Sequence, residues 1–266
     1  MTAISGRTRL LALLADPVLQ ARSPGMANAL LEQRGRHDAF VLVPMQVPAG
    51  ALEAVGGALR GIGNFAGALV SMPHKSAIVP LVDELTPEAA LVGAVNVVRR
   101  GPDGRLVGTI MDGEGFVAGL RAAKHELRGT ACLLVGAGGA ASAIAFALAR
   151  HGCASLAIVN RTASRAADLA ARVRAAFPAT AVRLGDTRDA RYDVAINATS
   201  LGMNIRDELP MSRDLVERAA LVAECVVAPE MTGLLALAAS RGRAIHTGVP
   251  MLEAQMSLML EFMGVD

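Results

Sequence analysis

Residues 131–141 read ACLLVGAGGAA, and this stretch decides the fold of the second half of the chain. Its first five residues are apolar without polar alternation, which is typical of a parallel strand buried on both faces. The next six fit the pattern G-x-G-x-x-A and lead into a predicted helix over 140–151. Strand, glycine turn and helix in this order indicate a dinucleotide site, with Gly136 in the tight turn and Gly138 beside a pyrophosphate.

The next strand along the chain, LAIV over 156–159, indicates which nucleotide binds. A protein that selects NAD usually ends this strand with an acid for the ribose 2′-hydroxyl. Here the strand is followed by NRT, residues 160–162, and no acid is present. Arg161 offers a planar cation suited to a 2′-phosphate, and Arg165 lies one helical turn on. The sequence therefore favours NADP over NAD.

Short apolar runs alternate with helical stretches on both sides of this motif, which predicts an α/β fold with parallel sheets. Two such series indicate two domains, 1–110 and 111–248, with a final helix within 249–266 packing back on the first domain. In the first domain we expect Ser23 to cap a helix and VNVV with RLVGT to form a hairpin-like pair. The other predicted strands are 10–15, 39–43, 65–70, 193–197 and 221–227, and the other helices include 86–94, 163–176 and 232–241.

Composition excludes several classes of protein. The chain has 266 residues, and its 53% hydrophobic content excludes disorder. Scarce aromatics and a net charge of only +2 argue against a nucleic-acid partner. The three cysteines have no metal-binding spacing, so we expect no metal site, and they suit a reducing cytoplasm. The apolar part of the amino terminus is too short for a membrane span.

The stretch SMPHK, residues 71–75, places a lysine shortly after the apolar run 65–70. Most charged side chains at strand ends are simply solvated. Lys75 alone therefore does not show whether it moves a proton.

Ten short stretches, in order and across nearly the whole chain, together resemble the shikimate dehydrogenase family. They are DPV (16–18), SP (23–24), PHK (73–75), GAVN (93–96), DGEGF (112–116), GAGGAA (136–141), NRT (160–162), NATSLGM (197–203), TGLL (232–235) and GVPMLEAQ (248–255). The resemblance implies an N-terminal substrate domain, a C-terminal Rossmann-type NADP domain and a cleft between them. It also implies reversible oxidation of a ring hydroxyl, as between shikimate and 3-dehydroshikimate, within aromatic amino acid biosynthesis.

The resemblance also assigns roles to residues. Lys75 and Asp112 match the family's catalytic pair, which takes up the hydroxyl proton while hydride leaves for the nicotinamide; a structural ion pair is the alternative. The expected substrate-binding residues are Ser23, Ser71, Asn96 and Gln255, although Ser23 could be only a helix cap and the two amides could bond to backbone. The expected cofactor-binding residues are Gly136, Gly138, Gly139, Ala140, Asn160, Arg161, Thr162, Arg165, Thr199 and Met203.

The sequence departs from the family where a polar substrate shell is expected. Ala21, Leu69, Ile110 and Val227 stand where the family has serine, two asparagines and a tyrosine. We therefore expect altered specificity, with shikimate, quinate or another cyclic hydroxy acid as the small-molecule partner of a monomer or homodimer. The alternatives are another NADP-linked dehydrogenase, such as a folate or amino-acid dehydrogenase, and a non-catalytic NADP-binding regulatory protein. The retained Lys75 and Asp112 argue against both alternatives.

Overall fold

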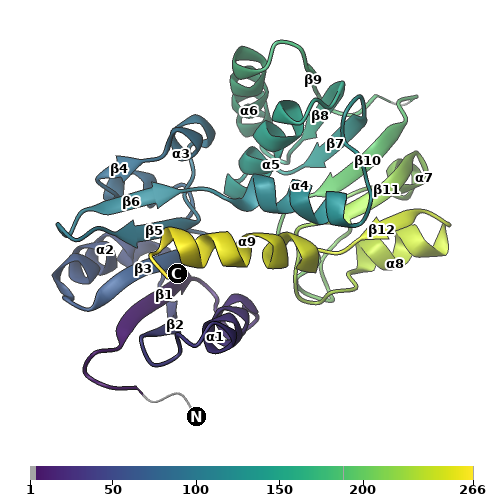
Figure 1. The fold of residues 1–266 in the computed structure, drawn as a ribbon. Helices are drawn as coiled ribbons and strands as arrows, with labels where there is room; N and C mark the ends of the chain where they lie inside the picture. Colours follow the sequence, from purple (N-terminus) through teal and green to yellow (C-terminus); the bar gives the residue numbers. More distant parts are fainter. Residues whose placement is uncertain (1–3, 188, 266) are drawn as a thin grey trace. The chain divides into compact units, whose positions relative to one another are not determined.

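The computed structural model describes residues 4–187 and 189–265. The chain divides into two compact units (Figure 1). The first consists of Met1–Met111 with Gln255–Asp266, and the second of Asp112–Ala254. Each unit has its own sheet, as the two series of strands and helices predict.

The described residues of the first unit form a six-stranded sheet in the order β2-β1-β3-β5-β6-β4. Strand β1 pairs in parallel with β2 and β3, whereas β5 is antiparallel to β3 and β6. The predicted hairpin is confirmed, but a wholly parallel sheet is wrong here, because the short turn after β5 can join only antiparallel neighbours. The strands are β1 (Arg9–Ala15), β2 (Phe40–Gln46), β3 (Phe65–Val70), β4 (Glu84–Leu85), β5 (Val97–Arg100) and β6 (Leu106–Thr109).

Of two helix starts in the first unit, one has a side-chain cap and the other does not. Thr86 caps α3 (Pro87–Val92), since its hydroxyl oxygen accepts from the Ala89 N–H at 3.3 Å. The predicted cap at Ser23 is wrong, because α1 (Ser23–Gln33) has Arg22 in the cap position and no side-chain cap bond. Proline near the helix start sets the backbone without needing such a bond. The remaining helices are α2 (Leu52–Gly61) and the short 3₁₀ turns η1 (Ala49–Ala51) and η2 (Val79–Leu81).

The second unit contains a parallel sheet in the order β12-β11-β10-β7-β8-β9, built from described residues. The strand order reverses between β7 and β10, and ligands of such sheets bind at the carboxyl ends of the strands beside this point. The short strands β9 and β12 were not predicted. The strands are β7 (Ala131–Val135), β8 (Ser155–Val159), β9 (Ala181–Leu184), β10 (Tyr192–Asn197), β11 (Ala219–Glu224) and β12 (Ala244–His246).

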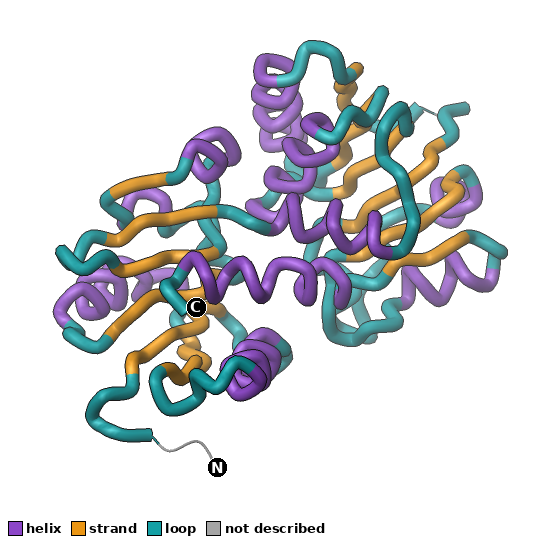
Figure 2. Tube along the Cα trace, viewed as in Figure 1, coloured by secondary structure: helices purple, strands orange, loops and turns teal. Residues whose placement is uncertain are grey.

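Helices alternate with these strands (Figure 2). Leu215 and Val216 of α7 and Leu234 and Leu235 of α8 share one buried cluster with side chains of β7, β10 and β11. These helices therefore cover one face of the sheet. The helices are α4 (Asp112–Ala122), α5 (Gly139–Arg150), α6 (Ala163–Ala176), α7 (Arg213–Glu217) and α8 (Gly233–Ser240).

The boundary between the units falls within the last helix, α9 (Val249–Phe262). In the first unit the end of α9 is tied to the end of α1 through Arg34. Its guanidinium donates to Glu261 Oε1 at 3.1 Å and to the Val265 carbonyl at 3.4 Å. These bonds hold the last turns of α9 against the first unit.

Two kinds of feature are absent from the described residues. No helix within 4–187 and 189–265 is long and apolar enough to cross a lipid bilayer. The same residues contain no group of three or more His, Cys, Asp or Glu side chains that could hold a metal ion.

Candidate functional site

The glycine turn after β7 has the geometry of a phosphate cradle. Gly136 has φ +126°, and a Cβ placed there would lie 2.8 Å from the Ala198 carbonyl oxygen, so only glycine fits. Gly138 is the N-cap of α5, and a Cβ built on it meets no described atom within 4 Å. The space beside Gly138 is therefore open, and the start of a helix favours an anion such as a pyrophosphate.

Asp112 is held at the start of α4 by a close contact between two helices. A Cβ on Gly113 would lie 2.2 Å from the Ala143 carbonyl oxygen, so this glycine lets α4 lie directly against α5. Asp112 is 3% exposed and belongs to the first turn of α4. A carboxylate in the first turn is stabilised by the partial positive charge of the helix start. The packing of the two helices thus fixes the position of a buried acid.

The end of β8 offers two uncommitted cations. The Asn160 side chain donates to the Thr162 carbonyl at 3.0 Å, which fixes the turn into α6. Arg161 and Arg165 are both exposed, and neither has an ion-pair partner among the residues that the structure describes. A guanidinium without an acidic partner is free to bind a phosphate in bidentate fashion. This arrangement fits the ribose 2′-phosphate that distinguishes NADP from NAD.

The loop after β10 is ordered by Asn197, which is completely buried. The Asn197 Oδ1 atom accepts from the Thr199 N–H at 3.0 Å and from the Thr199 hydroxyl at 2.7 Å. The Asn197 amide also donates to the Leu201 carbonyl at 2.9 Å. Because Thr199 belongs to this network, its backbone is set before any cofactor binds. The Ala198 carbonyl that touches Gly136 comes from the same loop.

Glu224 is a buried acid at this edge of the sheet that sequence reasoning missed. Its Oε2 atom accepts from the Asn197 amide at 2.9 Å, and its Oε1 atom accepts from the Thr232 hydroxyl at 2.8 Å. Burial raises the pKa of Glu224 to about 7, although its hydrogen bonds oppose the shift. An acid that ends an apolar strand, as in LVAE, is the signal that could have revealed it.

In the first unit, Lys75 lies in the turn that follows β3 and not at the strand end itself. The Ser71 N–H donates to the Leu14 carbonyl at 2.9 Å, which continues the β1–β3 pairing. Buried His74 donates from Nε2 to the Val47 carbonyl at 2.7 Å, so it acts as a structural anchor. Lys75 is half-buried, and its carbonyl accepts from the Val95 N–H at 2.7 Å. This bond places the lysine backbone next to the segment that carries Asn96.

Asn96 and Gln255 are brought together. Both are buried, and the Asn96 amide donates to Gln255 Oε1 at 3.1 Å. The Asn96 Oδ1 atom accepts from the Met111 N–H at 2.9 Å, so the expected alternative of a backbone bond is realised for this amide. Ser71 and Lys75 share the neighbouring turn. Ser23 is half-buried, and its hydroxyl makes no hydrogen bond within the described part of the chain.

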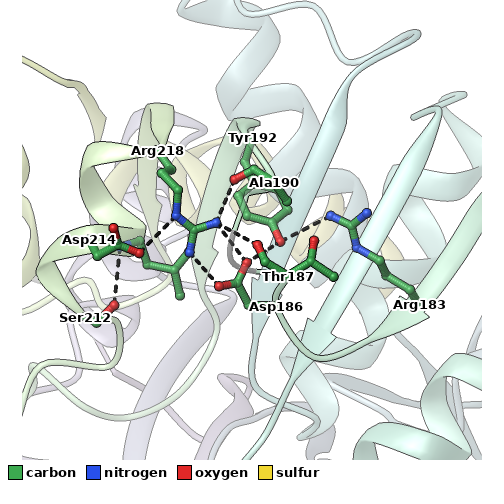
Figure 3. Close-up of polar contacts among 9 residues, drawn as sticks. Arg183, Asp186, Thr187, Ala190, Tyr192, Ser212, Asp214 and Arg218 are labelled. Carbon is green, nitrogen blue, oxygen red and sulfur yellow. Dashed lines mark hydrogen bonds and ion pairs between the residues drawn. The ribbon is translucent and has the colours of Figure 1, made fainter.

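A second polar cluster joins residues near the end of β9 and the start of β10 to the region of α7 (Figure 3). Arg218 donates to Asp186 Oδ1 at 3.1 Å and to Asp214 Oδ2 at 3.0 Å. Tyr192, buried at the start of β10, donates its hydroxyl to Asp186 Oδ1 at 2.7 Å. The bond from Arg218 is the main reason why the pKa of Asp186 lies below its usual range. The polar groups of these side chains are hydrogen-bonded to one another, so the cluster has a structural role.

Comparison with known proteins identifies two family regions. Residues 13–98 match the shikimate dehydrogenase substrate binding domain, and residues 120–223 match the family described as shikimate / quinate 5-dehydrogenase. A relative from Rubrobacter xylanophilus, named shikimate dehydrogenase (NADP(+)), is 38% identical across 99% of this chain and 90% of its own length.

Solved structures show the same fold. Shikimate 5-dehydrogenase from Listeria monocytogenes, in complex with shikimate and NAD, has a TM-score of 0.85 and 31% identity, covering 100% of this chain and 95% of that one. The enzyme from Thermus thermophilus, in complex with NADP(H) and shikimate, has a TM-score of 0.84 and 31% identity, covering 96% and 93%. On these matches over both units, the chain belongs to the shikimate dehydrogenase family.

Proposed function

We propose that this protein is an NADP-dependent oxidoreductase that interconverts shikimate and 3-dehydroshikimate. The observation that carries the proposal is the glycine turn at the start of α5 together with the free cations after β8, in a chain related to shikimate dehydrogenases over almost its full length. The relatives indicate the substrate, and the residues of the second unit indicate the cofactor. We assign cofactor binding to 111–248, and substrate binding to 1–110 with the helix within 249–266.

The residues of the second unit fit NADP by the chemistry of their donors. The amides at the start of α5, from Gly138, Gly139 and Ala140, would hold the pyrophosphate. Arg161 and Arg165 would bind the 2′-phosphate, with Asn160 and Thr162 shaping the turn. The loop carrying Thr199 and Met203 would close the remaining side of the nucleotide. Bound NADP supplies a hydride acceptor, which no side chain can provide.

The proton of the substrate hydroxyl needs a separate acceptor, and we assign it to Lys75 and Asp112. The half-buried Lys75 accepts the proton at Nζ, and the carboxylate of Asp112 stabilises the charge that results. Both residues are fixed by their backbones: Lys75 by its bond with Val95 N–H, and Asp112 by the contact of α4 with α5. Fixed groups lose little entropy when the substrate binds.

Four polar side chains of the first unit are assigned to the substrate. The Ser23 hydroxyl, which is not used as a helix cap, is available for a carboxylate at the start of α1. Asn96 and Gln255 are already hydrogen-bonded to each other, so they present fixed amide groups to ring hydroxyls. Ser71 adds a hydroxyl from the turn that carries Lys75.

Quinate or another cyclic hydroxy acid is a second candidate substrate. The match to a family described as shikimate / quinate 5-dehydrogenase favours it, and so does the loss of polar groups at four positions. Leu69 and Ile110 are 3% and 4% exposed and belong to the apolar core of the first unit. Ala21 and Val227 are half-buried and are not part of the buried core.

A turnover screen tests the proposal. Purified protein is mixed with NADP or NAD and with shikimate, quinate or a panel of other hydroxy acids, and NADPH formation is followed by absorbance. The proposal predicts turnover with NADP and shikimate. Binding of NADP without turnover on any hydroxy acid would indicate a regulatory protein instead, and turnover only on acyclic substrates would indicate another dehydrogenase. Lys75→Met is the control, because it should keep NADP binding and lose turnover.

The place and assembly of the protein are also proposals. We place it in the cytoplasm as a monomer or homodimer. All three cysteines are free thiols, which suits a reducing compartment. Size-exclusion chromatography with light scattering tests the assembly.

A further inference from the structure

The buried carboxylate of Glu224 joins two loops at the cofactor edge of the second unit. Glu224 ends β11, directly opposite Asn197 at the end of β10. Both residues are 0% exposed. One carboxylate oxygen reaches Asn197, and the other reaches Thr232, the N-cap of α8. A fully buried acid without a cation beside it is costly, so an arrangement of this kind calls for a reason.

The contacts show what the carboxylate fixes. The Asn197 amide has two ends: its nitrogen donates to Glu224, and its oxygen accepts from the backbone and hydroxyl of Thr199. Glu224 and the Leu201 carbonyl, which accepts from the same nitrogen at 2.9 Å, therefore together decide which way this amide points. If the amide turned over, its NH₂ group would face the Thr199 N–H, and two donors would oppose each other. The Leu201 carbonyl belongs to the loop over 199–203 itself, so Glu224 is the acceptor outside the loop that holds Asn197, and through it the loop, in this orientation.

The same carboxylate holds the segment after β11. The Val226 N–H donates to Glu224 Oε2 at 3.4 Å, and the Val226 carbonyl would lie 2.3 Å from a Cβ on Gly248. Gly202 has φ +104°, and its Cβ would lie 3.4 Å from Thr232 and 3.7 Å from Glu224 Oε1. Residues of both loops thus lie close to the carboxylate of Glu224.

We propose that Glu224 is a positioning residue for NADP, which acts through Asn197 to hold the loop of Thr199 in its binding-competent conformation. This inference rests on the proposed function, because it takes that loop as part of the cofactor site. Glu224 itself need not touch the cofactor. Its loss is expected to lower the fraction of protein whose loop is ready to bind, which raises the apparent Kd by the same factor.

The test compares variants at position 224 with a matched capping variant. Glu224→Met keeps a long side chain but removes every acceptor oxygen. It should weaken NADP binding about tenfold, which corresponds to a binding-competent loop in about a tenth of the molecules. Glu224→Gln can present its oxygen to Asn197 and its NH₂ to the Thr232 hydroxyl, so it should restore binding to within about threefold. The Kd is measured by calorimetry at about pH 8, above the pKa of about 7.

Ser212→Ala is the control for a loss of stability alone. Ser212 caps α7 as Thr232 caps α8, because each hydroxyl accepts from a backbone N–H at 3.2 Å. This variant should lower the melting temperature and leave the Kd for NADP unchanged. In Glu224→Met, kcat at saturating NADP should stay within about twofold of wild type while KM for NADP rises, since the competent state itself is unaltered.

Several results would overturn the inference. An unchanged Kd in Glu224→Met, or an equal rise in Ser212→Ala, would show a purely structural role. If Glu224→Met does not fold, Glu224→Asp takes its place. Its shorter side chain cannot reach Asn197 and Thr232 together, so a Kd equal to that of wild type would again refute the role. Wild-type protein that binds no NADP would instead refute the proposed function.

Discussion

Raising the pH from about 5 to about 8 is expected to destabilise the folded protein through Glu224. Burial raises the pKa of this carboxyl from its ordinary value of 4.5 to about 7 in the folded state. Folding therefore favours the protonated form. The contribution of Glu224 to stability is fully present below pH 4.5 and is lost as the pH rises through about 7.

The size of the effect follows from the two pKa values. A rise from 4.5 to about 7 corresponds to a loss of about 3 kcal/mol once the group is ionised, and most of it falls between about pH 5 and pH 8. The hydrogen bonds from Thr232 and Asn197 already oppose the shift, and the value of about 7 includes them. A domain with an ordinary stability of about 5–15 kcal/mol would show such a loss clearly.

Urea unfolding of wild type and Glu224→Gln across this pH range measures the effect. Glutamine stays neutral, so the difference between the two proteins isolates the ionisation of Glu224 from that of every other group. The free energy of unfolding of wild type should fall relative to the variant by about 2–3 kcal/mol as the pH rises. A difference that does not change with pH, or that grows in favour of wild type, would refute the account of a buried carboxyl held in its acid form.

Four further outcomes are expected. Lys75→Met should lower kcat about 10²-fold or more without changing the Kd for NADP, and initial rates within a few-fold of wild type would remove its role in proton transfer. Arg161→Ala should weaken NADP by about 1.5–3 kcal/mol in calorimetry and leave NAD nearly unchanged; equal weakening of both cofactors would count against it. Gly136→Ala, at φ +126°, should lower the melting temperature, whereas Gly138→Ala should keep it and weaken NADP, and the reverse order would contradict the proposed phosphate cradle. Ala21→Ser should raise kcat/KM for shikimate, unless wild type already approaches ~10⁵ M⁻¹s⁻¹, in which case altered specificity is wrong.

The sequence predicts those parts of the fold whose causes are local. The conformation of strand 131–135 and of the glycine turn after it is set by these residues themselves. Thr86 likewise needs only the amide of Ala89, three residues on, to act as a cap. Ser23 carries the same local signal, yet α1 begins without a side-chain cap. Proline beside it sets the helix start, so the serine is left for another use.

Features that depend on distant residues were missed. The role of Glu224 depends on its hydrogen bonds with Asn197 and Thr232. These residues lie beside it only because β10 pairs with β11 and α8 begins nearby. Cys132 and Cys153 likewise influence each other's pKa, which is raised for Cys132 and lowered for Cys153, although no motif joins them in sequence. Tertiary contacts of this kind follow from strand order, which residue patterns do not determine.

Transfer of deuterium from shikimate to the cofactor tests the central claim most directly. Shikimate labelled with deuterium at the carbon that bears the oxidised hydroxyl is incubated with NADP and the protein, and the reduced cofactor is analysed by mass spectrometry. The account predicts NADPH that carries one deuterium for each shikimate oxidised, because the hydride comes from that carbon. Unlabelled NADPH, or none at all with a protein that is folded and binds NADP, would contradict it.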